Sequence, residues 1–156
     1  MSSRYVSLLI ITTCVVTLDQ LTKLWVSATM RLGESRPLID GLLNLTYVQN
    51  SGVAFGMLAG RNMSAYVFVF ISLVALVLIL GFMRQITERE KLLSLALALV
   101  FSGAIGNVID RLRVGEVIDF IDVHVGSYHW FFFNVADSAI TVGGLLLAAH
   151  LLRRYP

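Results

Sequence analysis

The chain has 156 residues, of which 57% are hydrophobic without counting glycine and only 14% are charged. A soluble domain carries about 25% charged residues on average, and one of this size has too small an interior to hide so many apolar side chains. The composition excludes an ordinary soluble protein and a disordered chain. The net charge is +2, and the basic residues are scattered along the chain rather than clustered in the stripe that nucleic-acid binding needs.

Four segments are apolar and long enough to cross a membrane as helices, because a bilayer core about 30 Å thick needs about 20 residues. They cover residues 5–26, 63–83, 92–109 and 131–152. The middle two contain no charged residue, whereas the first and the last carry polar side chains. The sequence therefore predicts a single integral-membrane domain, residues 1–156, of the membrane α-helical class with four transmembrane helices.

The lysines and arginines near the ends of the spans predict the orientation of the chain. One set of segments holds Arg4, Arg84, Arg89, Lys91, Arg153 and Arg154. These residues precede the first span, lie between the second and third spans, or follow the fourth, so a four-span chain places them on one side. Cytoplasmic loops carry an excess of lysine and arginine, and we therefore expect both termini in the cytoplasm. The opposite loops also contain arginines, so the bias is modest.

The two outer segments are predicted to be more than simple connections. Within the first, residues 29–62, the stretch 42–48 is rich in β-forming residues and partly alternating, and a turn signal follows at Asn50 to Gly52. We expect a small antiparallel sheet or hairpin there, resting on the outer membrane surface. The second outer loop also alternates, over residues 117–123, and an aromatic stretch suited to the membrane interface follows it.

Ionisable groups inside a span are costly, so they usually face the protein interior or water and mark a functional site. Such groups and two amides gather here near the outer ends of three spans: Asp19, Lys23, Asn107, Asp110, Arg111, Asn134 and Asp137. Asp19 and Lys23 are four residues apart on one helix face, so we expect an ion pair. Asp110 and Arg111 are expected to form a pair that ends the third helix. The two amides suit hydrogen bonding within a buried polar network.

Asp119 and Asp137 are the most informative carboxylates. Asp119 lies in the segment that joins the third and fourth spans, and neither aspartate has a lysine or arginine within four residues. Two unpaired carboxylates in apolar surroundings are costly unless they share a proton, and such a pair has its two pKa values pushed apart. One ionised and one protonated carboxyl group is what aspartic proteolysis requires. Catalysis, a proton or cation pathway and a structural role are all open at this point.

Other chemistry has little support in the sequence. The three histidines are dispersed, and the chain contains no HExxH motif or Cys/His cluster, so no metal site is expected. The glycine pairs Gly103 with Gly106 and Gly143 with Gly144 are typical of close helix packing. Gly52 lies instead in the outer β-region, where glycine permits a turn or the close approach of a ligand.

Five short motifs, taken together and in order, resemble those of the lipoprotein signal peptidase (signal peptidase II) family of bacterial intramembrane aspartic proteases. They are residues 19–23 (DQLTK), 50–55 (NSGVAF), 106–111 (GNVIDR), 117–120 (VIDF) and 133–138 (FNVADS). Each motif alone is weak, but the five in this order in a four-span chain cover essentially the whole sequence. No motif position departs from the family pattern.

The resemblance implies four transmembrane helices and a small periplasmic β-sheet, the cradle, in the bacterial inner membrane with both termini cytoplasmic. It implies an endopeptidase that cleaves a prolipoprotein on the N-terminal side of its diacylglyceryl-modified cysteine, without a cofactor because water is the nucleophile. The implied catalytic residues are Asp119 and Asp137. The residues implied or expected to support them or to bind substrate are Asp19, Lys23, Asn50, Gly52, Asn107, Asp110, Arg111 and Asn134. The family inhibitor globomycin, a cyclic peptide, is expected to bind.

The competing function is a small channel or transporter subunit whose carboxylates relay protons or cations. Such a protein needs polar residues along the whole depth of the bilayer, whereas the ionisable residues here gather at one end and the second span has almost none. A peptidase fits this placement better. Its substrate has a signal helix and a lipid anchor, so it arrives from within the membrane lipid, and the scissile bond then lies at the outer surface.

Overall fold

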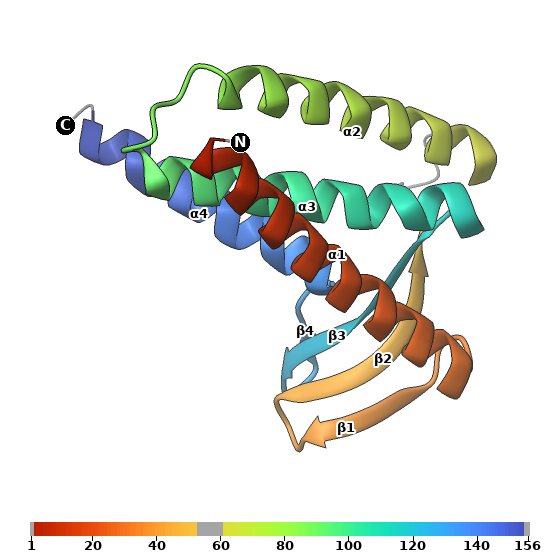
Figure 1. Ribbon diagram of the computed structural model, residues 1–156. Coiled ribbons are helices and arrows are strands. Elements are labelled where there is room, and N and C mark those ends of the chain that lie inside the picture. Colours follow the sequence, from red (N-terminus) through yellow and green to blue (C-terminus); the bar gives the residue numbers. More distant parts are fainter. Residues whose placement is uncertain (1, 53–60, 155–156) are drawn as a thin grey trace.

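The computed structural model describes residues 2–52 and 61–154, which form four helices and one small sheet (Figure 1). In chain order the elements are α1 (Ser3–Thr29), β1 (Ser35–Ile39), β2 (Leu43–Asn50), α2 (Arg61–Met83), α3 (Lys91–Val114), β3 (Val117–Val125), β4 (Tyr128–His129) and α4 (Val135–Arg154). All four helices are long and apolar enough to cross a membrane. The prediction of four spans is therefore confirmed, while residues 53–55 of the second motif lie outside the described residues.

Helix α3 is the centre of the bundle and contacts each of the other three helices. Just over half of its most apolar stretch, 56%, is buried, compared with 11–17% in the other helices. The outward faces of those helices are apolar: Phe70 and Val77 of α2 and Leu145 of α4 are each about two-thirds exposed. A bundle with apolar side chains on its outside is suited to lipid rather than to water.

Glycines bring α3 and α4 into direct backbone contact. A Cβ atom at Gly103 would lie 2.3 Å from the carbonyl oxygen of Ala136, and one at Gly143 would lie 2.7 Å from the carbonyl oxygen of Ala96. Small residues at such interfaces let helix backbones approach closely in a membrane. The packing role predicted for Gly103 and Gly143 is confirmed, whereas a Cβ at Gly144 would meet nothing within 4 Å.

The four strands form one antiparallel sheet in the order β1-β2-β3-β4, at the end of the bundle opposite the two termini (Figure 1). The expected hairpin corresponds to β1 and β2. The second outer loop adds β3 and β4 to the same sheet, with Asp119 of β3 opposite Val48 of β2. The two outer segments therefore build a single platform beside the helix ends.

An apolar cluster at the sheet end of the helices fixes the sheet to the bundle. It consists of Val26, Met30, Tyr47, Ile118 and Phe120, all at most 8% exposed. Ile118 and Phe120 flank Asp119 on β3. Packing of these two neighbours against the last turns of α1 and against β2 therefore holds Asp119 at the junction of sheet and helices.

Two predicted helix boundaries are wrong. The fourth helix begins at Val135 rather than at residue 131, because Phe133 pairs with Ile121 of β3 and Asn134 caps the helix. The third helix does not end at Asp110 and Arg111 but continues to Val114. It ends at Gly115, whose φ of 81° is the left-handed conformation that commonly terminates helices.

The neighbouring glycines of α4 give a matched test of the close α3–α4 contact. Gly143→Ala should lower the free energy of unfolding by about 1–3 kcal/mol, because its Cβ would collide with rigid backbone of α3. Gly144→Ala, one residue away in open space, should leave stability unchanged or raise it by up to about 1 kcal/mol. Thermal unfolding of both variants in detergent checks this. Equal stability of the two would contradict the close contact.

Candidate active site

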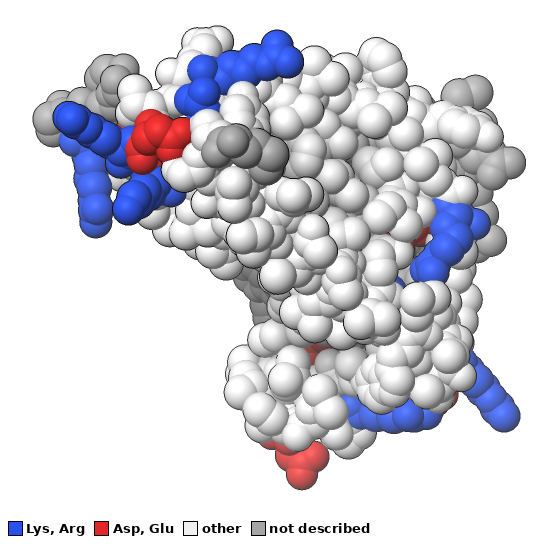
Figure 2. All heavy atoms as spheres, in the orientation of Figure 1, with Lys and Arg blue, Asp and Glu red and all other residues white. Residues whose placement is uncertain are grey.

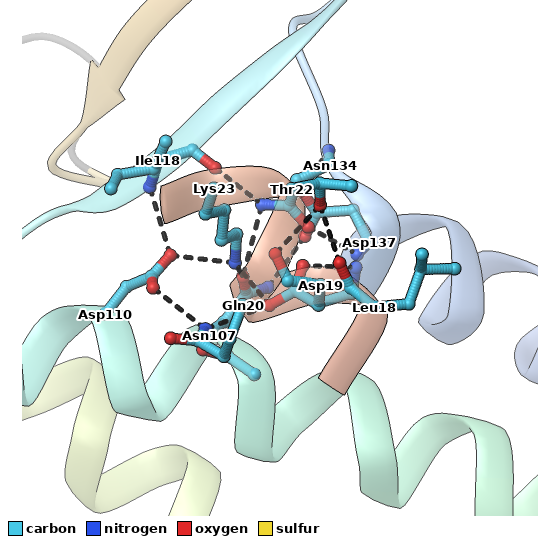
Figure 3. Close-up of polar contacts among 12 residues, drawn as sticks. Leu18, Asp19, Gln20, Thr22, Lys23, Asn107, Asp110, Ile118, Asn134 and Asp137 are labelled. Carbon is cyan, nitrogen blue, oxygen red and sulfur yellow. Dashed lines mark hydrogen bonds and ion pairs between the residues drawn. The ribbon is translucent and has the colours of Figure 1, made fainter. Parts of the chain in front are cut away.

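A buried polar cluster lies where α1, α3, β3 and the start of α4 meet, at the sheet end of the bundle (Figure 3). Six of the predicted site residues are at most 7% exposed there: Asp19, Lys23, Asn107, Asp110, Asp119 and Asn134. Asp137 is half-buried at the edge of this cluster. These residues come from four separate motifs, and the sequence predicted that they lie at the same depth in the membrane. The structure brings them together.

Lys23 is the centre of the cluster. Its ammonium nitrogen lies 2.8 Å from Asp19 and 2.7 Å from Asp110, and all three side chains are fully buried. The ion pair expected from the four-residue spacing of Asp19 and Lys23 is confirmed. The pair expected between Asp110 and Arg111 is replaced by the contact with Lys23. A buried charge is stable only when paired and hydrogen-bonded, so this triad ties α1 to α3.

The two carboxylates of the triad also fix elements beyond their own helices. Asp19 accepts a hydrogen bond from the backbone N–H of Ala136, at 2.9 Å, in the first turn of α4. Asp110 accepts one from the backbone N–H of Ile118, at 3.2 Å, at the start of β3. The first N–H groups of a helix lack partners within the helix and carry partial positive charge. Asp19 therefore anchors α4, and Asp110 anchors the strand that bears Asp119.

Gly106 allows Asp19 to approach α3. A Cβ atom at this position would lie 2.7 Å from the Asp19 Oδ2 atom, so any larger residue would displace the carboxylate. The same region contains Gln20, which the sequence analysis did not select as a site residue. Its amide nitrogen lies 3.1 Å from both Asp19 and Asp110 and 3.2 Å from the carbonyl oxygen of Gly106. The sequence did contain a sign of this role, because Gln20 is an amide next to Asp19 in a mostly apolar span.

Asn134 and Asp137 form a reciprocal cap at the start of α4. The Asn134 Oδ1 atom accepts a hydrogen bond from the Asp137 backbone N–H at 2.9 Å, and the Asp137 Oδ2 atom accepts one from the Asn134 backbone N–H at 3.2 Å. This is the geometry of a capping box, with aspartate in place of the usual glutamate. Asp137 is therefore held by the backbone of its own helix.

Asn107 connects the ion triad to Asp137. Its amide nitrogen donates to the Asp137 Oδ1 atom at 2.8 Å, and its carbonyl oxygen accepts from Lys23 at 3.2 Å. The ammonium group can only donate, so it faces the amide oxygen and turns the NH₂ group towards Asp137. Arg111 donates to the Asn107 backbone carbonyl at 3.5 Å and lies over the Phe68 ring.

Asp119 receives one amide on each carboxylate oxygen. Asn134 donates to Oδ1 at 2.7 Å and Asn50 donates to Oδ2 at 2.9 Å. The Asn50 side-chain oxygen in turn accepts from the Gly52 backbone N–H at 2.8 Å, and Gly52 has a φ of 74° that favours glycine. The tight turn predicted at Gly52 is confirmed. Within the described residues, the link from Asp119 to Asp137 runs through Asn134, which contacts both.

Burial raises the pKa of Asp119 to about 7, and the negative charge of nearby Asp137 acts in the same direction. The hydrogen bonds from Asn50 and Asn134 and the charge of Lys23 act in the opposite direction, because they favour the ionised carboxylate. Asp119 therefore exchanges its proton near neutral pH. A carboxyl group with this property beside a second carboxylate has the arrangement needed for paired acid and base chemistry.

An apolar groove of about 310 Å³ opens beside Asp137. The aromatic residues Trp130, Phe131 and Phe133 line it together with Ser138, Thr141 and Val142 of α4. Phe131 is 81% exposed, so the aromatic stretch predicted at the membrane interface is an open surface here. The groove therefore exposes the half-buried carboxylate along a largely apolar surface.

A second polar group, around Asp122 of β3, lies apart from this site, and the sequence did not predict it. Asp122 is 2.8 Å from His129 of β4 and accepts hydrogen bonds from Asn44 and Thr46 of β2. These contacts lower the pKa of Asp122 against the opposing effect of its burial. The group joins β2, β3 and β4, so Asp122 has a structural role in the sheet.

Comparison with known proteins shows the family to which the chain is similar. A family model described as signal peptidase (SPase) II matches residues 11–153. The lipoprotein signal peptidase of Geobacter sulfurreducens is 51% identical over 136 residues, or 87% of this chain and 85% of that protein. That of Desulforapulum autotrophicum is 43% identical over 94% of this chain and 92% of that protein.

Two solved structures, each described as a bacterial membrane enzyme, have the same fold. Their TM-scores are 0.84 and 0.85 at 36% identity, and the matches cover 94% and 93% of this chain and 87% and 92% of those chains. The motifs, the fold and these likenesses agree over nearly the whole sequence. The chain therefore belongs to the signal peptidase II family and is a multi-pass membrane protease.

Proposed function

We propose that this chain removes the signal peptide of diacylglyceryl-modified prolipoproteins on the N-terminal side of the modified cysteine, with Asp119 and Asp137 as its catalytic pair. One observation carries the assignment of residues. Asp119, with a pKa raised to about 7, is joined through Asn134 to the half-buried Asp137, and both lie at the sheet end of a membrane bundle. The curated relatives are lipoprotein signal peptidases, which supports the substrate.

The proposed chemistry uses water as the nucleophile. Asp137 accepts a proton as the water oxygen attacks the peptide carbonyl carbon, and protonated Asp119 donates its proton to the carbonyl oxygen. The C–N bond of the tetrahedral intermediate then breaks as the proton held by Asp137 passes to the departing amine. One hydroxyl of the intermediate returns its proton to Asp119 as the product carboxylic acid forms, which restores both aspartates to their starting states. Asn134, Asn107 and Asn50 hold the two carboxyl groups in place, since their amides contact the reacting oxygens.

The surroundings of the pair suit a lipid-anchored substrate. The signal helix and the acyl chains are apolar and cannot leave the bilayer without cost, and the aromatic groove beside Asp137 opens on the lipid-facing side of α4. The β-sheet beside the helix ends provides a platform for the extended cleavage region. We expect globomycin, the cyclic peptide inhibitor of the family, to bind at this cleft.

The orientation we propose places the sheet in the periplasm and both termini in the cytoplasm, with the chain in the bacterial inner membrane. Figure 2 shows lysine and arginine side chains at both ends of the molecule, with one group of them around the end that carries the termini. This end includes Arg4, Arg84, Arg89, Lys91 and Arg153, as the positive-inside rule requires of a cytoplasmic surface.

Asp119→Asn and Asp137→Asn should each reduce prolipoprotein cleavage by a few orders of magnitude, since asparagine keeps the shape but can neither accept nor donate the required proton. The double variant should be no slower than either single variant, because residues that act as one unit are not additive. Cleavage by purified protein in detergent, without an ion gradient, measures this. Asp122→Asn on the same strand is the matched control and should retain near-parent turnover. Substantial turnover by either catalytic variant, with its fold intact, would remove that aspartate from the mechanism and favour a channel.

Asn50→Ala should slow cleavage about tenfold to a hundredfold, because a hydrogen bond to a charged group contributes about 1.5–3 kcal/mol. Loss of this donor should also raise the pKa of Asp119, since the bond favours the ionised form. The pH profile should be bell-shaped with an alkaline limb near pH 7, and that limb should move to higher pH in the variant. Gln49→Ala, which removes a side chain bonded to Tyr47, is the control. An unchanged rate and profile in Asn50→Ala would refute the positioning role.

Reporter fusions test the orientation. A reporter enzyme that works only in the cytoplasm should be active when it is fused at residue 87, between α2 and α3, or at the C-terminus. A reporter that works only in the periplasm should be active when it is fused at residue 34. The reason is that both termini and the α2–α3 connection lie at the basic end of the bundle (Figure 1). Fusion activities in cells provide the measurement, and a periplasmic C-terminus would reverse the proposed orientation.

A further inference from the structure

Gln20 of α1 belongs to the buried cluster, but the proposed chemistry gives it no role. Three acceptors surround one atom of its amide group: Asp19 Oδ2 at 3.1 Å, Asp110 Oδ1 at 3.1 Å and the carbonyl oxygen of Gly106 at 3.2 Å (Figure 3). An amide oxygen cannot face three acceptors, so this atom is the NH₂ nitrogen. The two carboxylates are the stronger acceptors, because hydrogen bonds to an ionised group are shorter and stronger than those to a neutral one.

Lys23 leaves part of the two carboxylates without a donor. An ammonium group has three N–H donors, and those of Lys23 serve both carboxylates and one amide oxygen. One positive charge between two carboxylates leaves a net negative charge in this fully buried group. The lysine contacts the Oδ2 atom of Asp110, so the Oδ1 atom needs another donor. Arg113 approaches Oδ1 only to 3.8 Å, beyond hydrogen-bond distance, whereas Gln20 lies within it.

Gln20 and Lys23 therefore bridge the same pair of carboxylates. Both contact the Oδ2 atom of Asp19, while on Asp110 Gln20 contacts Oδ1 and Lys23 contacts Oδ2. Residues three positions apart share one face of a helix, so both side chains of α1 reach α3. A carboxylate that is bonded through one oxygen can still rotate, whereas bonds to both oxygens fix its orientation. Gln20 thus completes a closed ring of four side chains across the α1–α3 interface.

This ring carries the two backbone anchors of the proposed catalytic pair. Asp110 accepts a hydrogen bond from the Ile118 N–H at 3.2 Å, and Asp19 accepts one from the Ala136 N–H at 2.9 Å. Ile118 and Ala136 each immediately precede one aspartate of that pair. A shift of either carboxylate in the ring therefore moves the backbone beside one of the reacting groups. Small misplacements of reacting groups cost large factors in rate.

We propose that Gln20 is a positioning residue of the peptidase. Its amide holds the carboxylates of Asp19 and Asp110 in a fixed relation, and these carboxylates in turn set the separation of the two catalytic aspartates. The inference rests on the proposed function, because it assumes that this pair performs the chemistry. Gln20 acts through the backbone anchors rather than on the reacting atoms, so its loss should lower kcat and leave KM nearly unchanged.

Gln20→Met keeps the length of the side chain and removes its donor. This variant should lower kcat about tenfold to a hundredfold, with KM within about twofold of the parent value. Cleavage of a detergent-solubilised prolipoprotein, normalised to folded protein, measures both constants. Gln49→Met is the matched control, because it makes the same substitution at an amide bonded to Tyr47 outside the ring. The control should retain the parent kcat.

Gln20→Glu adds a readout that depends on pH. The new carboxyl group can donate one hydrogen bond when it is protonated, but it adds a third negative charge to the ring when it is ionised. Its rate relative to the parent should therefore rise at least threefold, to a rough estimate, as the pH falls from about 8 to about 5.5. The relative rate of Gln20→Met should not change with pH, because methionine does not titrate.

Hydrogen–deuterium exchange tests the anchors without reference to cleavage. In Gln20→Met, the amides of residues 117–120 and 135–138 should exchange at least threefold faster, to a rough estimate, because the carboxylates that hold them are less firmly fixed. Amides in the middle of α2 should exchange at the parent rate. Unchanged exchange at both anchors would refute the positioning role, whatever the result of the cleavage assay.

The cleavage data separate this inference from the proposed function. Parent kcat in Gln20→Met, with Asp119→Asn and Asp137→Asn inactive, would refute the role of Gln20 alone. Turnover in those two aspartate variants would instead refute the catalytic pair, and with it the catalytic importance of Gln20. A raised KM at parent kcat would indicate substrate contact and overturn the inference, as would an equal loss in Gln49→Met. If Gln20→Met fails to fold, a relative rate of Gln20→Glu that does not change with pH would also refute it.

Discussion

The buried ammonium group of Lys23 is the interaction on which the rest of the site depends. A lysine buried in an apolar bundle is stable only with compensating charge, and Asp19 and Asp110 provide it at 2.8 and 2.7 Å. Removal of Lys23 would leave two buried carboxylates without their cation. The triad therefore fixes α1 against α3, and its two carboxylates also hold the first turn of α4 and the start of β3.

The geometry of the proposed catalytic pair follows from these anchors. Asp119 and Asp137 belong to different elements, a strand and a helix, and each element is fixed by one carboxylate of the triad. Asn134 then sets the relation between them, because it caps the helix that carries Asp137 and donates to Asp119. The opposing influences on the Asp119 pKa, burial against amide donors and Lys23, bring its titration to about pH 7. Support and reactivity thus come from the same buried network.

The membrane explains the contrast between the two ends of the molecule. Along the bundle, apolar side chains face outward and glycines at the α3–α4 interface allow close contact, since lipid gives little hydrophobic drive for association. Among the described residues, charged side chains lie towards the two ends of the bundle rather than in its middle. The sheet end holds a satisfied network around the carboxylates. The other end has a separate cavity whose lining includes two basic and two acidic side chains, those of Arg4, Lys91, Glu88 and Glu90.

The sequence by itself determined four features: the four spans, the ion pair of Asp19 and Lys23, the gathering of polar residues at one end of the spans, and the family. These features depend only on composition, local spacing and short motifs. The tertiary structure alone decided that Asp110 pairs with Lys23, that Gln20 joins the cluster, that the second outer loop completes the sheet, and that Asn134 links the two aspartates. These contacts join residues up to 117 positions apart, such as Asp19 and Ala136. Helix packing and strand register create them, and no local pattern in the chain encodes which distant partners meet.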